Sequence, residues 1–234
     1  MVYRTSLIYQ FNVALEEKTQ SYQMASYLFK VGIGATGFYT VLLVYNRNTA
    51  TTYAIILAQS EVFDFEGLLT LLRSNSCLAP QPVFVPVMLM HLLLIMTMTR
   101  IQHQGQRLDY TEHCLGQHTY SSKPREDPFR ADFETITPAL NGTARTLSMM
   151  EMRTQARQML LEKCMTYIEA TARSATPDIK SLLHKSHDTI RQHLEMTRNS
   201  NQNLLLLATF EQKRIQIQLA AVSRSGELLF LIRD

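Results

Sequence analysis

The sequence has few cysteines, few charged side chains and no recognisable catalytic motif. Its three cysteines, Cys77, Cys114 and Cys164, are odd in number and far apart. A disulfide framework is therefore excluded, and a reducing compartment such as the cytoplasm is expected. The residue spacing contains no nucleophile elbow, P-loop or paired-carboxylate site. We therefore expect no enzyme activity.

Charge is low and nearly balanced. Of the 234 residues, 18% are charged and 46% are hydrophobic, which supplies a core and excludes wholesale disorder. The 23 Lys and Arg against 20 Asp and Glu leave a net charge of +3, with both signs interspersed. This excess is too small to predict a nucleic-acid partner. Because the first residues lack a basic start and an apolar core, no secretion is expected, and we place the chain in the cytoplasm or at the cytoplasmic face of a membrane.

The charged side chains are unevenly distributed along the chain. Residues 1–120 carry 7 basic and 7 acidic side chains, and residues 121–234 carry the other 16 and 13. Residues 121–131 between them are polar and contain Pro124 and Pro128, a composition typical of a linker. We expect a small β-containing region at 1–60, a helical region at 61–120, this linker at 121–131, and a long antiparallel helical hairpin at 132–234. The predicted fold class is mainly α with a small N-terminal β element.

Two β-branched and aromatic runs lie in the N-terminal region. Residues 40–45 (TVLLVY) and 52–58 (TYAIILA) flank a polar segment at 46–51, which predicts a hairpin. A further strand is expected within residues 5–12, and the apolar spacing over 62–72 predicts a short helix.

An uncharged segment between Arg73 and Arg100 contains the densest apolar run. Pro80, Pro82 and Pro86 crowd its start and leave residues 87–98 (VMLMHLLLIMTM) as a clean helix. Such a helix is about 18 Å long, whereas the hydrocarbon core of a bilayer is about 30 Å thick. A buried helix is favoured, and membrane association through residues 82–98 is the alternative.

Residues 32–37 match the G-x-G-x-x-G pattern, with glycines at Gly32, Gly34 and Gly37. A dinucleotide site requires a helix after the last glycine, but the residues that follow predict a strand. The nearest suitable acid, Glu61, is 29 residues beyond Gly32 instead of about 20. We expect a glycine turn that opens a hairpin, and a nucleotide-binding enzyme is the third hypothesis for function.

Glu112, His113, Cys114 and His118 are metal-ligand types within seven residues. Imidazole and thiolate suit zinc, but His113 and His118 would point about 140° apart on a helix. No second Cys/His pair completes four ligands. His184 and His187 share a helix face with basic residues and are expected to be exposed. We predict no metal site and no cofactor.

The C-terminal half has a heptad pattern. Phe133, Leu140, Leu147, Leu161 and Ile168 share one heptad position. Ile136, Met150 and Cys164 lie three residues further on, and Thr154 and Arg157 interrupt this apolar seam. The pattern predicts a helix that starts at or just before Pro138 and continues to about Arg173. A break at residues 174–178 then precedes a second helix, from Pro177 to about Val222, which Ser223–Gly226 is expected to interrupt. Its apolar stripe is expected at Leu205, Ala208, Ile215, Leu219 and Val222.

Three segments resemble the cytosolic region of the fungal CorA-like proteins, which are relatives of the CorA magnesium transporters. They are Pro82–Pro86 running into Leu89, Leu92 and Leu93; Leu115–His118 with Asp132–Phe133, Leu140–Asn141 and Met150–Arg153; and Leu204–Val222, above all Lys213–Leu219. Arg4–Phe11 is similar to the family's opening strand. The resemblance implies a soluble helical region that precedes two membrane helices, with a Gly-Met-Asn signature at the pore.

This chain contains no Gly-Met-Asn and stops at Asp234 before any spanning segment. We therefore expect a truncated or degenerate non-catalytic module that does not conduct by itself. A lone apolar stripe on a long helix needs cover in water. The chain is expected to form a homo-oligomer, or to bind a full-length relative, through the face bearing Leu205, Ala208, Ile215, Leu219 and Val222.

Overall fold

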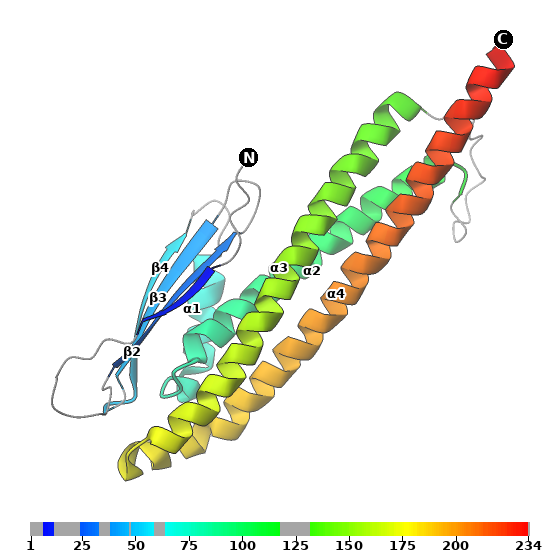
Figure 1. Cartoon of the computed structure of the whole chain (residues 1–234). Coiled ribbons are helices and arrows are strands. Elements are labelled where there is room, and N and C mark those ends of the chain that lie inside the picture. Colours follow the sequence, from blue (N-terminus) through cyan, green and yellow to red (C-terminus); the bar gives the residue numbers. More distant parts are fainter. Residues whose placement is uncertain are drawn as a thin grey trace. The chain divides into compact units, whose positions relative to one another are not determined.

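A computed structural model describes residues 7–11, 24–32, 38–46, 48–58, 64–117 and 132–233. Four strands come first: β1 (Leu7–Phe11), β2 (Met24–Gly32), β3 (Phe38–Asn46) and β4 (Thr51–Ala58). Helices α1 (Phe65–Ser74), η1 (Ser76–Leu78), α2 (Phe84–Cys114), α3 (Phe133–Ser174) and α4 (Pro177–Arg233) follow (Figure 1). The predicted fold class is confirmed: the chain is mainly α with a small N-terminal sheet, and the long C-terminal helices pack against each other.

The chain forms two compact units. Unit 1 comprises Met1–Leu94 and Ala156–Asn201, and unit 2 comprises Ile95–Gln155 and Gln202–Asp234. Each unit therefore combines stretches that are distant in the sequence, whereas the predicted regions 1–60, 61–120 and 132–234 are contiguous. The predicted linker at 121–131 lies outside the described residues.

The sheet in unit 1 is an antiparallel meander with the order β1-β2-β3-β4. The predicted hairpin is confirmed as β3 and β4, with Asn46 paired with Thr51 at its closed end, and β1 lies within the strand expected at 5–12. Strand β2 was not predicted. Its apolar residues include the consecutive run Tyr27–Leu28–Phe29, and such a run does not distinguish a strand from a helix by periodicity.

The two faces of the hairpin β3–β4 differ in exposure. Val41, Leu43 and Tyr45 point to one face and are buried. The Tyr45 hydroxyl donates to the Pro80 carbonyl oxygen at 3.2 Å, which joins this face to the turn before α2. The opposite face carries exposed apolar side chains, among them Ile55, because successive residues of a strand point to opposite sides.

The first turns of helices α1 and α2 contain residues that suit the start of a helix. The Asp64 carboxylate accepts from the Gly67 N–H at 2.8 Å and caps α1, which confirms the short helix expected at 62–72. Helix α2 has 31 residues and is longer than the clean helix expected at 87–98. Pro86 does not shorten it, because Pro86 lies in the first turn, where N–H groups have no helical partner.

The length of α2 corrects the argument that this segment is too short for a membrane. Residues 84–114 are long and apolar enough to cross one, with a mean hydropathy of 1.8 in their most apolar window. In this structure 61% of that window is buried inside the chain. A buried core helix passes the same test, so the finding is weak evidence for a span.

Helix α3 follows the predicted heptad. Leu140, Leu147, Thr154, Leu161 and Ile168 are buried at intervals of seven, and Thr143, Met150, Arg157, Cys164 and Thr171 form the second buried row. Burial raises the pKa of the Cys164 thiol to about 12. The helix starts earlier than expected, at Phe133, because the Asp132 carboxylate caps it by accepting from the Thr135 N–H at 3.2 Å.

Helix α4 starts at Pro177 as predicted but continues to Arg233, so the expected interruption at Ser223–Gly226 is wrong. Serine and a single glycine each cost a helix only about 1 kcal/mol or less, and no proline is present to break it. The two helices of the hairpin contact each other within both units. In unit 1 Asn201 donates to Gln158 at 3.2 Å, and in unit 2 Gln212 donates to Glu151 at 2.8 Å.

Candidate functional site

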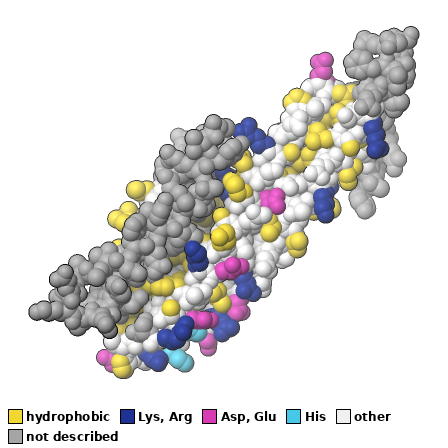
Figure 2. Space-filling model, viewed as in Figure 1, with side chains coloured by type: hydrophobic (Ala, Val, Ile, Leu, Met, Phe, Trp, Pro, Cys, Tyr) yellow, Lys and Arg dark blue, Asp and Glu magenta, His cyan; other side chains and the backbone are white. Residues whose placement is uncertain are grey.

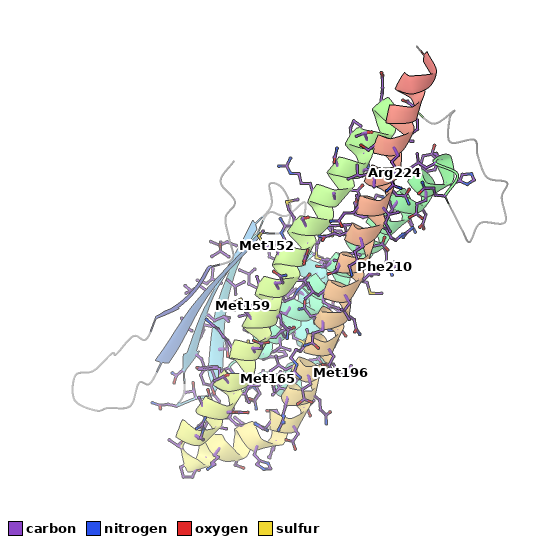
Figure 3. The ribbon with its side chains drawn as sticks, turned by 45° about the vertical axis from the view of Figure 1, so that its right-hand side comes forward. Met152, Met159, Met165, Met196, Phe210 and Arg224 are labelled. Carbon is purple, nitrogen blue, oxygen red and sulfur yellow. The ribbon has the colours of Figure 1, made fainter. Side chains whose placement is uncertain are left out.

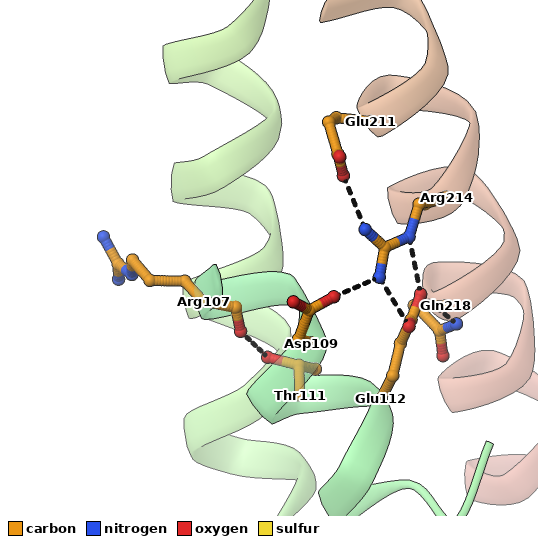
Figure 4. A network of polar contacts seen from close by, with 7 residues as sticks. All are labelled: Arg107, Asp109, Thr111, Glu112, Glu211, Arg214 and Gln218. Carbon is orange, nitrogen blue, oxygen red and sulfur yellow. Dashed lines mark hydrogen bonds and ion pairs between the residues drawn. The ribbon is translucent and has the colours of Figure 1, made fainter. Parts of the chain in front are cut away.

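The densest polar cluster among the described residues lies in unit 2, around Arg214 of α4 (Figure 4). Its guanidinium donates twice to Glu112, from Nε to Oε1 at 3.1 Å and from Nη2 to Oε2 at 2.6 Å. The same nitrogen donates to Asp109 Oδ1 at 2.6 Å, and the other terminal nitrogen donates to Glu211 Oε2 at 2.9 Å. We call these four residues the Arg214 network.

Helix spacing brings these side chains together. Asp109 and Glu112 are three residues apart on α2, and Glu211 and Arg214 are three apart on α4, so each pair shares a helix face. Gln218, one turn after Arg214, donates to Glu112 Oε1 at 3.3 Å. Gly105 leaves room for the Glu211 carboxylate, because a Cβ atom there would lie only 3.3 Å from Glu211 Oε1.

The network carries more negative than positive charge, since three carboxylates surround one guanidinium. Burial raises the pKa of Glu211, the Arg214 charge opposes this increase, and Asp109 and Glu112 add to it. Burial alone would lower the pKa of Arg214, but its hydrogen bonds to Glu112 and Asp109 raise the pKa overall. The guanidinium therefore stays charged and offsets the cost of bringing these carboxylates together.

The Arg214 network consists of three carboxylates and one guanidinium that pair with one another. It contains no hydroxyl, thiol or imidazole that could act as a nucleophile or proton carrier near neutral pH. Nowhere in the described parts of the chain do three His, Cys, Asp or Glu side chains gather in a way that could hold a metal ion. Its evident effect is to join α2 to α4 within unit 2.

The structure describes only some of the residues that the sequence analysis considered as metal ligands. Glu112 belongs to the Arg214 network, where its carboxylate is occupied by the guanidinium. His113 and Cys114 are half-buried at the end of α2, and His118 lies outside the described residues. His184 is exposed as expected, and His187 is partly exposed with its Nδ1 3.2 Å from Asp188 Oδ1.

The glycine motif lies between two strands. Gly32 ends β2, where it pairs with Phe38 at the start of β3, and Gly34 and Gly37 lie outside the described residues. The strand expected after the motif is confirmed. A pyrophosphate site of the dinucleotide-binding type needs a helix N-terminus at that place, so the motif lacks the element on which its chemistry depends.

The predicted interaction face of α4 lies against the chain's own core. Ala208, Ile215 and Val222 are buried, and Leu205 and Leu219 are half-buried. The buried stripe in unit 2 consists of Leu204, Ala208, Glu211, Ile215, Gln218 and Val222. Three of the five side chains of this face therefore make contacts within the chain, and association through the face stays a prediction.

A second stripe on α4, which sequence reasoning missed, is apolar and exposed. Leu206, Phe210 and Ile217 are 69%, 56% and 63% exposed. We call these three residues the outer stripe; Figure 3 shows Phe210 on the side of α4 away from α3. The available signal was the seven-residue interval between Phe210 and Ile217 and the four-residue interval between Leu206 and Phe210.

A groove of about 390 Å³ lies in unit 2 between α2 and the first turns of α3. Leu108, Ile136 and Leu140 are among its apolar residues, and His103 and Arg107 are exposed at its edge. The Arg107 guanidinium points away from the Arg214 network (Figure 4). None of the described side chains that line the groove has a buried polar atom without a hydrogen-bond partner, so nothing in it points to a particular ligand.

Charged groups of both signs are interspersed over the described surface in Figure 2, with hydrophobic side chains between them. No protein-family model, curated protein or solved structure matches the chain. These comparisons therefore neither support nor contradict the resemblance to CorA-like proteins.

Proposed function

We propose that this chain is a non-catalytic helical module, similar to the cytosolic region of a CorA-like magnesium transporter, that acts in the cytoplasm by self-association. The observation that carries the proposal is the outer stripe of α4. This face of the helix presents three large apolar side chains that are each more than half exposed to water. Their exposure is unfavourable in free energy unless another surface covers them.

The geometry of the outer stripe suits a helical partner. Each of its residues follows a buried residue by two positions: Leu206 follows Leu204, Phe210 follows Ala208, and Ile217 follows Ile215. Two positions correspond to about 200° around a helix, so the outer stripe lies opposite the buried one. Its intervals of four and seven residues are those of a coiled-coil seam.

We take the occupant to be α4 of a second copy of this chain. The same intervals must occur on a helix that packs along the outer stripe, and α4 itself has them. Charge does not oppose this pairing strongly: from Gln202 to Arg224, the exposed side chains of α4 are uncharged except Lys213 and Arg224. Lys213 falls at the seam position between Phe210 and Ile217, and its long side chain can extend the ammonium group out of the seam into water.

Light scattering of the purified full chain tests the proposal. The wild type is expected to exceed the monomer mass of 26.9 kDa, and Phe210→Glu is expected to reduce that mass. The matched control is Gln216→Lys, which places a charge on an exposed neighbouring position outside the outer stripe and is expected to leave the mass unchanged. A wild-type monomer at all concentrations, or an equal mass for the wild type and Phe210→Glu, would contradict the proposal.

The second candidate is membrane association through α2, which the length and hydropathy of residues 84–114 favour. Carbonate extraction of a membrane fraction separates the two functions. A membrane-embedded α2 keeps the chain in the pellet after extraction, whereas a self-associating cytosolic module is released. The 61% burial of the apolar window is the reason to rank this candidate second.

A further inference from the structure

Strand β4 is an edge strand of the described sheet. Among the described strands it pairs only with β3, and the other side of an edge strand carries backbone donors and acceptors that can pair with another chain. Its residues Thr51–Ala58 read TTYAIILA and include no charge and no proline. Natural edge strands usually carry such residues because they discourage pairing with another chain. The absence of both makes β4 a ready template for an additional strand.

The side chains of β4 also favour pairing with an additional strand. Tyr53, Ile55 and Leu57 lie on one face and are 63%, 57% and 62% exposed. The register places Ile55 beside Leu42 of β3, which is also exposed. The exposed apolar surface is therefore continuous across two strands and reaches the open edge.

We propose that β4 pairs antiparallel with β4 of a second copy, across a two-fold axis at Ile55. In this register Ile55 lies opposite its own copy, and Tyr53 lies opposite Leu57 of the other chain. Aromatic and branched apolar side chains placed opposite each other stabilise an antiparallel pair. Because the strand has no charge, the symmetric pairing brings no like charges together. The two four-stranded sheets then become one continuous sheet.

The sequence of β4 favours a second copy of this chain over an unrelated peptide as the partner at this edge. A two-fold axis requires that a strand be complementary to itself when reversed, and β4 meets this requirement on both faces: Ala54 lies opposite Ile56, as Tyr53 lies opposite Leu57. This interface uses residues of unit 1, whereas the outer stripe consists of residues of unit 2.

Single-cysteine crosslinking tests the register. The exposed Cys77 and the half-exposed Cys114 are first replaced by serine, and the buried Cys164 is kept. Ile55→Cys is then expected to form a disulfide-linked dimer on mild oxidation, because directly opposite residues have Cβ atoms about 4.5–5.5 Å apart. Tyr53→Cys is the matched control: its copies would be four residues apart along the pair, about 13 Å, and should not crosslink. The double variant Tyr53→Cys with Leu57→Cys should crosslink again.

Two outcomes would overturn the proposal. The first is the absence of a crosslink at residue 55 in a chain that circular dichroism shows to be folded. The second is equal crosslinking at 53 and 55, which indicates collision or another register. Adding Phe210→Glu separates this interface from the one on α4: the crosslink at residue 55 should persist even when the substitution lowers the mass measured by light scattering.

Discussion

The two faces of α4 in unit 2 reverse the usual distribution of polarity. The inner face includes Glu211 and Gln218, both buried, whereas the outer face presents Leu206, Phe210 and Ile217 to water. Ile215 and Ile217 make the contrast clearest, since the same residue type is 1% exposed at one position and 63% at the other. Residue type alone therefore does not decide which face of this helix is inside.

Pairing of the buried polar groups lowers the free-energy cost of burying them on the inner face. Burying a charge is costly unless it is paired and hydrogen-bonded. Glu211 is held by Arg214, and Gln218 donates to Glu112, so both inner polar residues connect to the Arg214 network. In the outer stripe the Phe210 ring lies 5.9 Å from the Arg214 guanidinium carbon, but Leu206, Phe210 and Ile217 each stay more than half exposed to water, which is why we assign the stripe to a partner.

Lysine substitutions at the two isoleucines should give the largest difference. Ile215→Lys buries an ammonium group in a packed site and is expected to lower the free energy of unfolding by roughly 3–5 kcal/mol. Ile217→Lys introduces the same group at an exposed position and should change the stability of the monomer by only about 0.5 kcal/mol. Urea denaturation followed by circular dichroism measures both, at a protein concentration low enough that light scattering shows a monomer, since association adds to the apparent stability. Similar losses at the two positions would mean that the assigned faces are wrong.

Removing the guanidinium should have the next largest effect. Arg214→Met leaves the partly buried Glu112 and Glu211 without their partner and is expected to cost about 2–3 kcal/mol at pH 7. Lys213→Met is the control, because Lys213 is an exposed neighbour outside the network.

The deficit of Arg214→Met should depend on pH. Burial already raises the folded-state pKa of Glu211, and loss of the positive charge raises it further. A carboxyl whose folded pKa exceeds its unfolded value favours folding once protonated, so its protonation adds stability as the pH falls. The difference between wild type and Arg214→Met should therefore shrink between pH 7 and about pH 4. A constant difference over this range would show that the carboxylates are not its cause.

The sequence predicted the seam of α3 better than that of α4 for a physical reason. On α3 the apolar residues at Leu140, Leu147, Leu161 and Ile168 stand among polar neighbours, so the heptad identifies the buried face even where Thr154 interrupts it. On α4 the run Leu204–Leu207 offers an apolar residue to every face. The predicted stripe included Leu205 and Leu219, whereas the structure buries Leu204 and Gln218.

The Arg214 network could not be predicted from local patterns. Glu112 and Arg214 are 102 residues apart in the sequence, and their meeting depends on how α2 packs in unit 2. The available signals were an acidic pair at Asp109 and Glu112 and a Glu211–Arg214 pair at helical spacing. Each is common on solvated helices, so neither indicates a contact without the fold.

Gln218 allows the smallest and most discriminating test of the inner face. Its Nε2 donates to Glu112, but its Oε1 is buried without a hydrogen-bond partner. Gln218→Leu loses one hydrogen bond, worth about 1 kcal/mol, but removes the unsatisfied oxygen and adds apolar contact. The two effects oppose each other, so the free energy of unfolding should change by less than about 1 kcal/mol. Gln218→Ala makes the same polar deletion without filling the space and should be less stable than Gln218→Leu by about 1–2 kcal/mol. If Gln218→Leu proves as destabilising as Gln218→Ala, the contact with Glu112 is essential, and the inner face of α4 depends on polar pairing more than on burial.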